Sequence, residues 1–181
     1  MDALELLEII ERGEDTSHQF KRDINNETVM TQELAAFANT KGGLLIVGVD
    51  DDGTVVGLTT EDVQRLNRMI SNSASSRIRN PINPTTENVQ LEDGLIMIVT
   101  IPEGIDKPYI TNDGVIYVKS GADKRKVTSR EEIRRLFAEA DLIHAGETPI
   151  DGSTTNDLDQ DFFDEFYEEV NGHSFQDERL P

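Results

Sequence analysis

Four polar side chains in the first fifty residues have the types and spacing of a metal-assisted phosphate site. Glu14, Gln19 and Lys21 lie close together, and Asp50 follows the apolar run 44–49. If 18–24 is a strand beside that run, Glu14 and Asp50 could converge and hold Mg²⁺ or Mn²⁺ through carboxylate oxygens, with Lys21 stabilising charge that develops on a phosphate. Gln19 offers an amide where a carboxylate would bind the ion better. The alternative is that Glu14 and Asp50 are ordinary turn acids and Lys21 is a solvated strand residue.

A second set of candidates is basic. The stretch 119–126 holds four bases around a turn of small residues, directly after a predicted strand. Backbone N–H groups and charged side chains can both approach a phosphate backbone there, although a solvated basic loop is an equally simple interpretation. Arg77 and Arg79, near the end of a predicted helix, could extend the same patch or offset the helix dipole. The predicted phosphate-binding residues are Lys21, Arg77, Arg79, Lys119, Lys124, Arg125 and Lys126.

The elements that position these residues follow from the apolar pattern. Leu44 to Val49 is apolar apart from Gly48, which is typical of a strand buried on both faces. Gly42 and Gly43 end the preceding helix. In the last predicted helix, Ile133, Leu136 and Phe137 should face inward. The expected elements are helix 3–12, strand 18–24, helix 28–40, strands 44–49 and 54–58, a helix from 59 or 60 to about 79, strands 87–91, 95–101, 108–110 and 115–118, and a helix beginning at Ser129. This order predicts an α+β fold, in which helices pack on a mixed, hairpin-rich β-sheet.

Charge divides the chain into two parts. The formal net charge is −19, but twelve acids and one base lie beyond residue 140, so the first 140 residues carry only −8. We therefore expect a folded domain at 1–140. An acidic linker and helix at 141–181, with aromatic residues at 162–167, would begin a further C-terminal domain. The net charge weakens a nucleic-acid interpretation without excluding it, because local basic clusters remain.

Composition and motifs exclude several classes of protein. The chain has no cysteine, so disulfides and thiolate metal sites are excluded. No apolar run is long enough to span a bilayer and the N-terminus is an acidic amphipathic helix, which predicts a cytoplasmic protein without membrane contact. The glycines do not form a P-loop or a dinucleotide-binding fingerprint, because they precede a strand and not a helix. The three histidines lack the spacing of metal ligands.

Several stretches, taken in order, resemble one family. Gly13-Glu14 with Gln19-Phe20-Lys21 is similar to its G-E-x-x-x-x-E-F-K pattern, and Ala36-Phe37-Ala38-Asn39-Thr40-Lys41-Gly42-Gly43 through Gly48-Val49-Asp50-Asp51 to its A-F-A-N-T-x-G-G…G-V-x-D. Ile101-Pro102, Lys107-Pro108-Tyr109 and Tyr117-Val118-Lys119-Ser120-Gly121 are similar to its closing P…K-P-[YF]…Y-[VI]-R-x-G. Residues 5–138 thus resemble the Schlafen-type AlbA_2 domain.

The resemblance implies a DNA-binding domain of a bacterial or archaeal transcriptional regulator. Some animal Schlafen proteins use this fold as a metal-dependent RNA nuclease with three carboxylates, which match Glu14, Gln19 and Asp50 here. Because Gln19 is an amide, we expect no cofactor and treat a nuclease with Mg²⁺ or Mn²⁺ on Glu14 and Asp50 as the alternative. A protein-interaction module that uses the acidic helix is the third possibility. Open sheet edges would also allow a homodimer.

Overall fold

A four-stranded sheet organises the first of two units in this chain. The computed structural model describes residues 1–144, 154 and 159–172, which belong to the units Met1–Ile143 and His144–Pro181. The sheet has the order β1-β2-β5-β4. Its strands are β1 (His18–Lys21), β2 (Gly43–Val47), β5 (Gly94–Ile101) and β4 (Thr85–Leu91). The pair β1–β2 is parallel and the other two pairs are antiparallel. This mixed sheet with its helices confirms the predicted α+β fold class.

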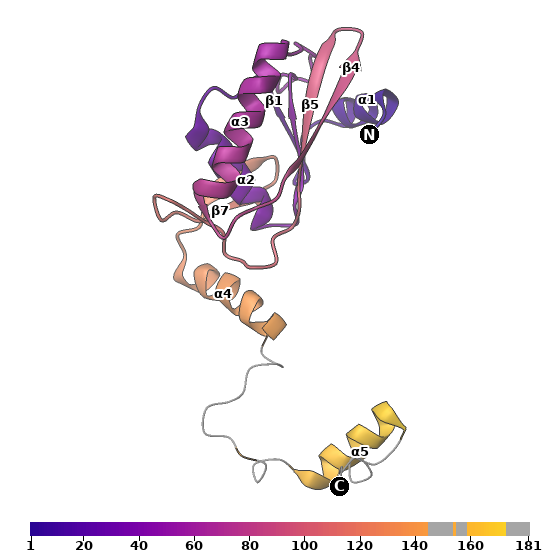
Figure 1. The fold of residues 1–181 in the computed structure, drawn as a ribbon, viewed down its shortest axis with the longest axis vertical. Helices are drawn as coiled ribbons and strands as arrows, with labels where there is room; N and C mark the ends of the chain where they lie inside the picture. Colours follow the sequence, from indigo (N-terminus) through magenta and orange to yellow (C-terminus); the bar gives the residue numbers. More distant parts are fainter. Residues whose placement is uncertain (145–153, 155–158, 173–181) are drawn as a thin grey trace. The chain divides into compact units, whose positions relative to one another are not determined.

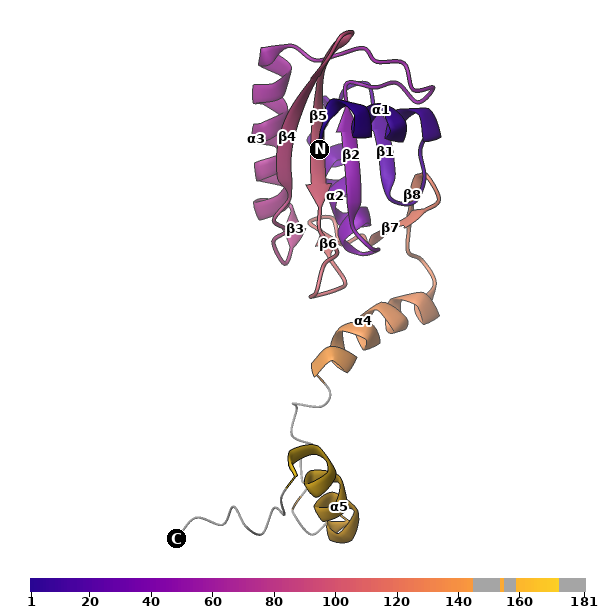
Figure 2. The same ribbon diagram turned by 90° about the vertical axis from the view of Figure 1, so that its right-hand side faces the viewer.

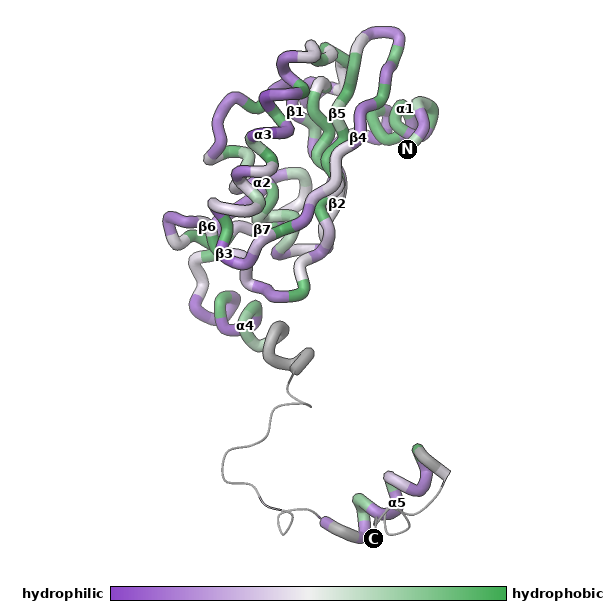
Figure 3. The backbone as a smooth tube through the Cα atoms, viewed as in Figure 1, coloured by the Kyte–Doolittle hydropathy of each residue, from purple (hydrophilic) through white to green (hydrophobic). Residues whose placement is uncertain are grey.

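Helices cover both faces of the sheet because both sets of alternating side chains on the central strands are apolar (Figures 1 and 2). Leu45 and Val47 of β2 pack against α2 (Glu27–Ala38) and α3 (Thr60–Ser76). Ile46 points to the other face and packs against α1 (Ala3–Arg12). Figure 3 shows β2 and β5 as mostly hydrophobic, whereas the edge strand β4 carries polar residues. The expected strand buried on both faces is confirmed.

Two two-stranded sheets and a fourth helix accompany the four-stranded sheet. β3 (Ile78–Arg79) pairs with β6 (Ile110–Thr111), and β7 (Tyr117–Ser120) pairs with β8 (Asp123–Lys126). The stretch 119–126 is thus a β-hairpin and not a loop. α4 (Arg130–His144) follows, and its Leu136 packs in a third apolar cluster with residues of this hairpin.

The structure corrects three local expectations. Residues 54–58 make only isolated bridges, Val49 with Val55 and Leu58 with Leu95, because the chain crosses there from the end of β2 to β5. The strands expected at 108–110 and 115–118 share one bridge, between Ile110 and Ile116, and their other pairings are with β3 and β8. Phe137 is 47% exposed, because Leu136 occupies the inward position of α4.

The second unit contains one described helix, α5 (Gln160–Asn171). The Asp159 side chain accepts a hydrogen bond at its N-terminus, and Gly172 in the left-handed conformation ends it. The predicted aromatic helix is therefore present, with Phe162, Phe166 and Val170 exposed. Most of the linker predicted before it lies outside the described residues. No described helix is both long enough and apolar enough to cross a membrane.

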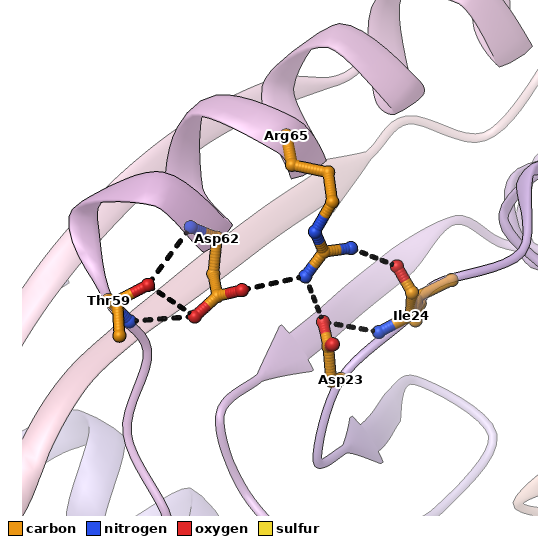
Figure 4. Close-up of polar contacts among 5 residues, drawn as sticks. All are labelled: Asp23, Ile24, Thr59, Asp62 and Arg65. Carbon is orange, nitrogen blue, oxygen red and sulfur yellow. Dashed lines mark hydrogen bonds and ion pairs between the residues drawn. The ribbon is translucent and has the colours of Figure 1, made fainter.

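A polar network fixes the start of α3 against the segment that follows β1 (Figure 4). Thr59 and Asp62 form a reciprocal capping box. The Arg65 guanidinium donates to Asp62 Oδ1 at 3.0 Å, to Asp23 Oδ1 at 2.7 Å and to the Ile24 carbonyl at 2.7 Å. The Thr59 hydroxyl first, and Arg65 next, lower the pKa of Asp62 to about 2. The ionised carboxylate is therefore the form that holds this network together.

We predict an acid-dependent loss of stability from this network. A carboxyl group with a lowered folded-state pKa contributes stability above its unfolded value of 3.8, and the contribution is lost as the pH falls toward 2. Asp62→Asn should lower the urea midpoint at pH 6, and its unfolding curve should approach the wild-type curve near pH 2. Glu61→Gln, in the same helical turn, is the control and should match the wild type throughout. A constant difference between Asp62→Asn and wild type across this range would contradict the prediction.

Candidate nucleic-acid interface

The β7–β8 hairpin turns two of its lysines toward the body of the protein. Lys119 and Lys124 are directly opposite in the hairpin register, so both side chains lie on one face. Two ammonium groups placed this way repel each other unless acids lie nearby. β1 and α2 supply the acids and polar groups that make this arrangement stable.

Lys119 is buried, with 6% of its surface exposed. Its ammonium group donates to Gln19 Oε1 and to the Ala122 carbonyl, and lies 4.8 Å from the centre of the Phe37 ring. Burial lowers the pKa of Lys119, while the charges of Glu33 and Glu14 oppose that shift. Its side chain therefore holds the hairpin to β1 and is not available to a phosphate.

Gln19 connects this lysine to Glu14. Glu14 Oε1 accepts hydrogen bonds from Gln19 Nε2 at 2.6 Å and from the Phe20 amide at 2.7 Å. The orientation of the amide is fixed by chemistry, because an ammonium can only donate to its oxygen and a carboxylate can only accept from its nitrogen. A carboxylate at position 19 could not donate to Glu14. Gln19 is therefore suited to link an acid and a base without a metal ion.

Lys124 pairs with an acid inside the helical layer. Its ammonium lies 2.6 Å from Glu33 Oε1, and the Glu33 side chain is only 2% exposed. Glu33 Oε2 is buried and has no hydrogen-bond partner among the described residues. The sequence analysis missed Glu33, although its spacing from Met30 and Phe37 by three and four residues places it on the inward face of α2.

The predicted metal site is only partly brought together. Glu14 and Gln19 are in contact, but Lys21 lies 3.5 Å from Asp51, and Asp50 accepts from Arg22 at 3.2 Å. Within the described ranges, no three His, Asp or Glu side chains are grouped so that they could hold a metal ion. The oxygen of Gln19 already accepts from an ammonium group. These residues therefore do not fit Mg²⁺ or Mn²⁺ as they are arranged.

Two of the four remaining predicted phosphate-binding cations have acidic partners. Arg77 lies 2.5 Å from Glu27, and Arg125 donates to both oxygens of Glu132, which lowers the pKa of that carboxyl group. Arg79 and Lys126 are exposed and make no ion pair with any residue that the structure describes. Of the seven predicted residues, these two are the most accessible to a phosphate.

A groove of about 330 Å³ adds bases that the sequence analysis did not select. It lies between the end of α2, β7 and α4. We call it the basic groove, and its cationic rim consists of Lys41, Lys107, Arg125 and Arg135. Glu103 and Glu132 also line it. These bases are far apart in the sequence, so no charge run indicated them. The segment 107–135 contains eight bases and four acids, a net charge of +4 in a chain of −19.

We compared the chain with curated proteins and with solved structures. No curated protein matches it. Among solved structures, the DIP2311 protein of Corynebacterium diphtheriae has 22% identity and a TM-score of 0.49 over 66% of this chain, which spans 24% of that protein. The N-terminal domain of a RecG-related protein from Nitrosomonas europaea has 23% identity and a TM-score of 0.47 over 72% of this chain and 96% of that domain.

The decisive match is to a family defined by sequence. The Schlafen, AlbA_2 family matches residues 14–128. This range begins at Glu14, includes α2, the central strand β2 and the motif Lys107-Pro108-Tyr109, and extends through the β7–β8 hairpin. It covers well over half of the chain and most of the first unit, and this chain is therefore a member of the Schlafen AlbA_2 family.

Proposed function

We propose that the first unit binds nucleic acid, with DNA as the expected target, through contacts to phosphates. The observation that carries this proposal is the net charge of +4 on residues 107–135 in a chain of −19, because these residues form one wall of the basic groove. Phosphate contacts depend on accessible cations and carry little sequence information. Lys41 on the groove and the exposed Arg79 and Lys126 would provide them, whereas Lys107 is paired with Glu103 at 2.5 Å.

Membership of the family adds support for a nucleic-acid role. On this basis we further propose that the chain is the DNA-binding part of a bacterial or archaeal transcriptional regulator. A nuclease is the weaker candidate, since Glu14, Gln19 and Asp50 do not form a site that fits a metal ion. We also propose a homodimer, because β4 is an edge strand that a second copy of the chain could pair with.

Fluorescence anisotropy of labelled duplex DNA, single-stranded DNA and structured RNA at two salt concentrations tests the binding proposal. Log affinity should fall steeply with log salt for at least one probe. The triple variant Lys41→Gln, Arg79→Gln and Lys126→Gln should reduce this slope by about one for each lost phosphate contact. Lys124 is not a suitable position, because Lys124→Glu would place a second carboxylate against buried Glu33.

The control is Arg12→Gln on α1, which covers the opposite face of the sheet from α2. It should leave the slope unchanged. Salt-independent binding, or no binding to any probe, would overturn the proposal. A parallel series with Mn²⁺ addresses the nuclease, which requires metal-dependent loss of intact probe and inactivity of Asp50→Asn.

A second candidate function is protein interaction through α5. Phe162, Phe166 and Val170 are exposed at intervals of four residues, with five acids in the same helix, which suits a basic partner with an apolar groove. The assay above separates the two functions when residues beyond Asp141 are deleted. Nucleic-acid binding should persist or improve without this acidic segment, whereas a function based on α5 would be lost.

A further inference from the structure

A second cavity is lined by Arg77 and by Asp113, a carboxyl group that also feels the charge of Lys126. It has a volume of about 380 Å³ and falls in the size range of ligand sites. We call it the polar pocket. Its lining consists of Thr28, Thr31 and Gln32 of α2, Arg77 after α3, Thr111 at the end of β6, and Asn112 and Asp113 of the turn that follows. Neither the resemblance nor the candidate interface assigns it a ligand.

Two opposite charges define the chemistry of the polar pocket. Arg77 places one nitrogen, Nη2, on Glu27, and a guanidinium has five N–H donors, so others remain available. Asp113 is exposed, and a hydrogen bond from Thr111 together with the charge of Lys126 lowers its pKa. The lining therefore offers a planar donor group and an ionised acceptor group to the same ligand.

Guanine matches this pair better than the other bases. Its O6 and N7 atoms accept from an arginine fork, while its N1–H and N2 amino groups donate to an acceptor such as a carboxylate. Adenine and cytosine lack the O6–N7 acceptor pair, and thymine lacks an amino donor. We propose that the polar pocket binds a guanine base, with Arg77 on its O6–N7 edge and Asp113 on its N1–N2 edge.

A neighbouring cation favours a guanine that is carried on a strand, and this part of the proposal rests on the proposed function. Lys126 acts electrostatically on Asp113. Its ammonium group could contact a phosphate next to the base. The guanine must be unpaired, because cytosine covers its N1–N2 edge in a duplex.

Substitution of single atoms in the ligand tests the proposal. The probes are labelled oligo-dT 12-mers whose central residue is dG, dA, dC, dT, deoxyinosine or 7-deaza-dG. The wild type should bind the dG probe roughly 5- to 150-fold more tightly than the dT probe. Deoxyinosine lacks the N2 amino group that faces Asp113, and 7-deaza-dG lacks the N7 acceptor for Arg77, so both should lose most of this preference.

Variants that lack one acceptor or donor group test which side chain causes each loss of guanine preference. Asp113→Ala has no acceptor for the N2 amino group and should bind dG and deoxyinosine probes equally. Arg77→Met has no N–H donor for N7 and should bind dG and 7-deaza-dG probes equally. Asp93→Asn is the control, because Asp93 is also an exposed acid before a glycine but lies in the β4–β5 connection. This variant should retain the full guanine preference.

Free GMP, titrated against the full chain by calorimetry, distinguishes the source of the base. Binding of GMP that Asp113→Ala abolishes would support the pocket even if every oligonucleotide failed to bind, and would identify a free nucleotide as its ligand. Equal, salt-dependent affinity for all central bases would overturn the guanine pocket while the proposed function stands. No binding of GMP and no binding of any oligonucleotide would overturn both.

Discussion

Gly42→Ala should destabilise the first unit by roughly 2–5 kcal/mol, the combined expectation for a strained backbone and an overpacked site. Gly42 has a φ of +70°, and an added Cβ would lie 2.5 Å from the Ile101 carbonyl oxygen and 2.6 Å from the Glu103 nitrogen. Both are backbone atoms, which cannot move aside as a flexible side chain could. The measurement is the free energy of unfolding in urea.

Gly121→Ala separates the two causes. Gly121 has a similar φ of +64°, but an added Cβ there has no atom within 4 Å. This variant should lose only the strain, on the order of 1–2 kcal/mol. Equal losses in the two variants would show that the close approach of residues 101–103 to Gly42 is unimportant. A larger loss for Gly42→Ala would show that position 42 needs glycine for a second reason besides its positive φ. That reason is the close packing between the end of α2 and the segment after β5.

Lys119→Ala should cost about 3–5 kcal/mol of unfolding free energy. The change removes a long buried side chain and leaves Gln19 Oε1 and the Ala122 carbonyl without their donor. Lys126→Ala, in the other strand of the same hairpin, is the control. Lys126 is exposed, so its effect should stay within about 0.5 kcal/mol.

A double-mutant cycle tests whether the cost arises from the polar link itself. Lys119→Met and Gln19→Leu each leave one polar partner buried, whereas the double variant removes both. The double variant should therefore lose clearly less stability than the sum of the two single variants. Additive losses would show that Lys119 and Gln19 stabilise the fold independently. They would contradict the argument that the amide at position 19 serves to link Lys119 to Glu14.

The internal role of these residues also changes the interpretation of the basic stretch. Lys119 and Lys124 are neighbours in sequence of Arg125 and Lys126, yet they face Gln19 and Glu33 inside the unit. Experiments on nucleic-acid binding that replace the whole stretch would confuse loss of fold with loss of contact. Variants at Lys41, Arg79 and Lys126 avoid this problem, because these side chains are exposed.

The sequence by itself determined the elements with a strong local signal. Leu44 to Val49 is apolar apart from Gly48 and follows two glycines. The α1 and α3 segments have amphipathic spacing and capping residues, so the positions of these elements follow from nearby residues alone. The sequence also determined the family, because its motifs are short contiguous stretches at 13–21, 36–51 and 101–121. It did not determine the short strands β3 and β6, since two-residue strands depend on partners that are distant in sequence.

Only the tertiary structure decided which polar residues act together. Lys119 meets Gln19 across 100 positions of the chain, and Lys124 meets Glu33 across 91. The basic groove and the polar pocket likewise combine residues from several elements. Ion pairing and burial depend on these long-range contacts, and they decide whether a charged side chain is held inside or left for a ligand. The order of charged residues along the sequence does not show which of them are buried and paired and which are accessible.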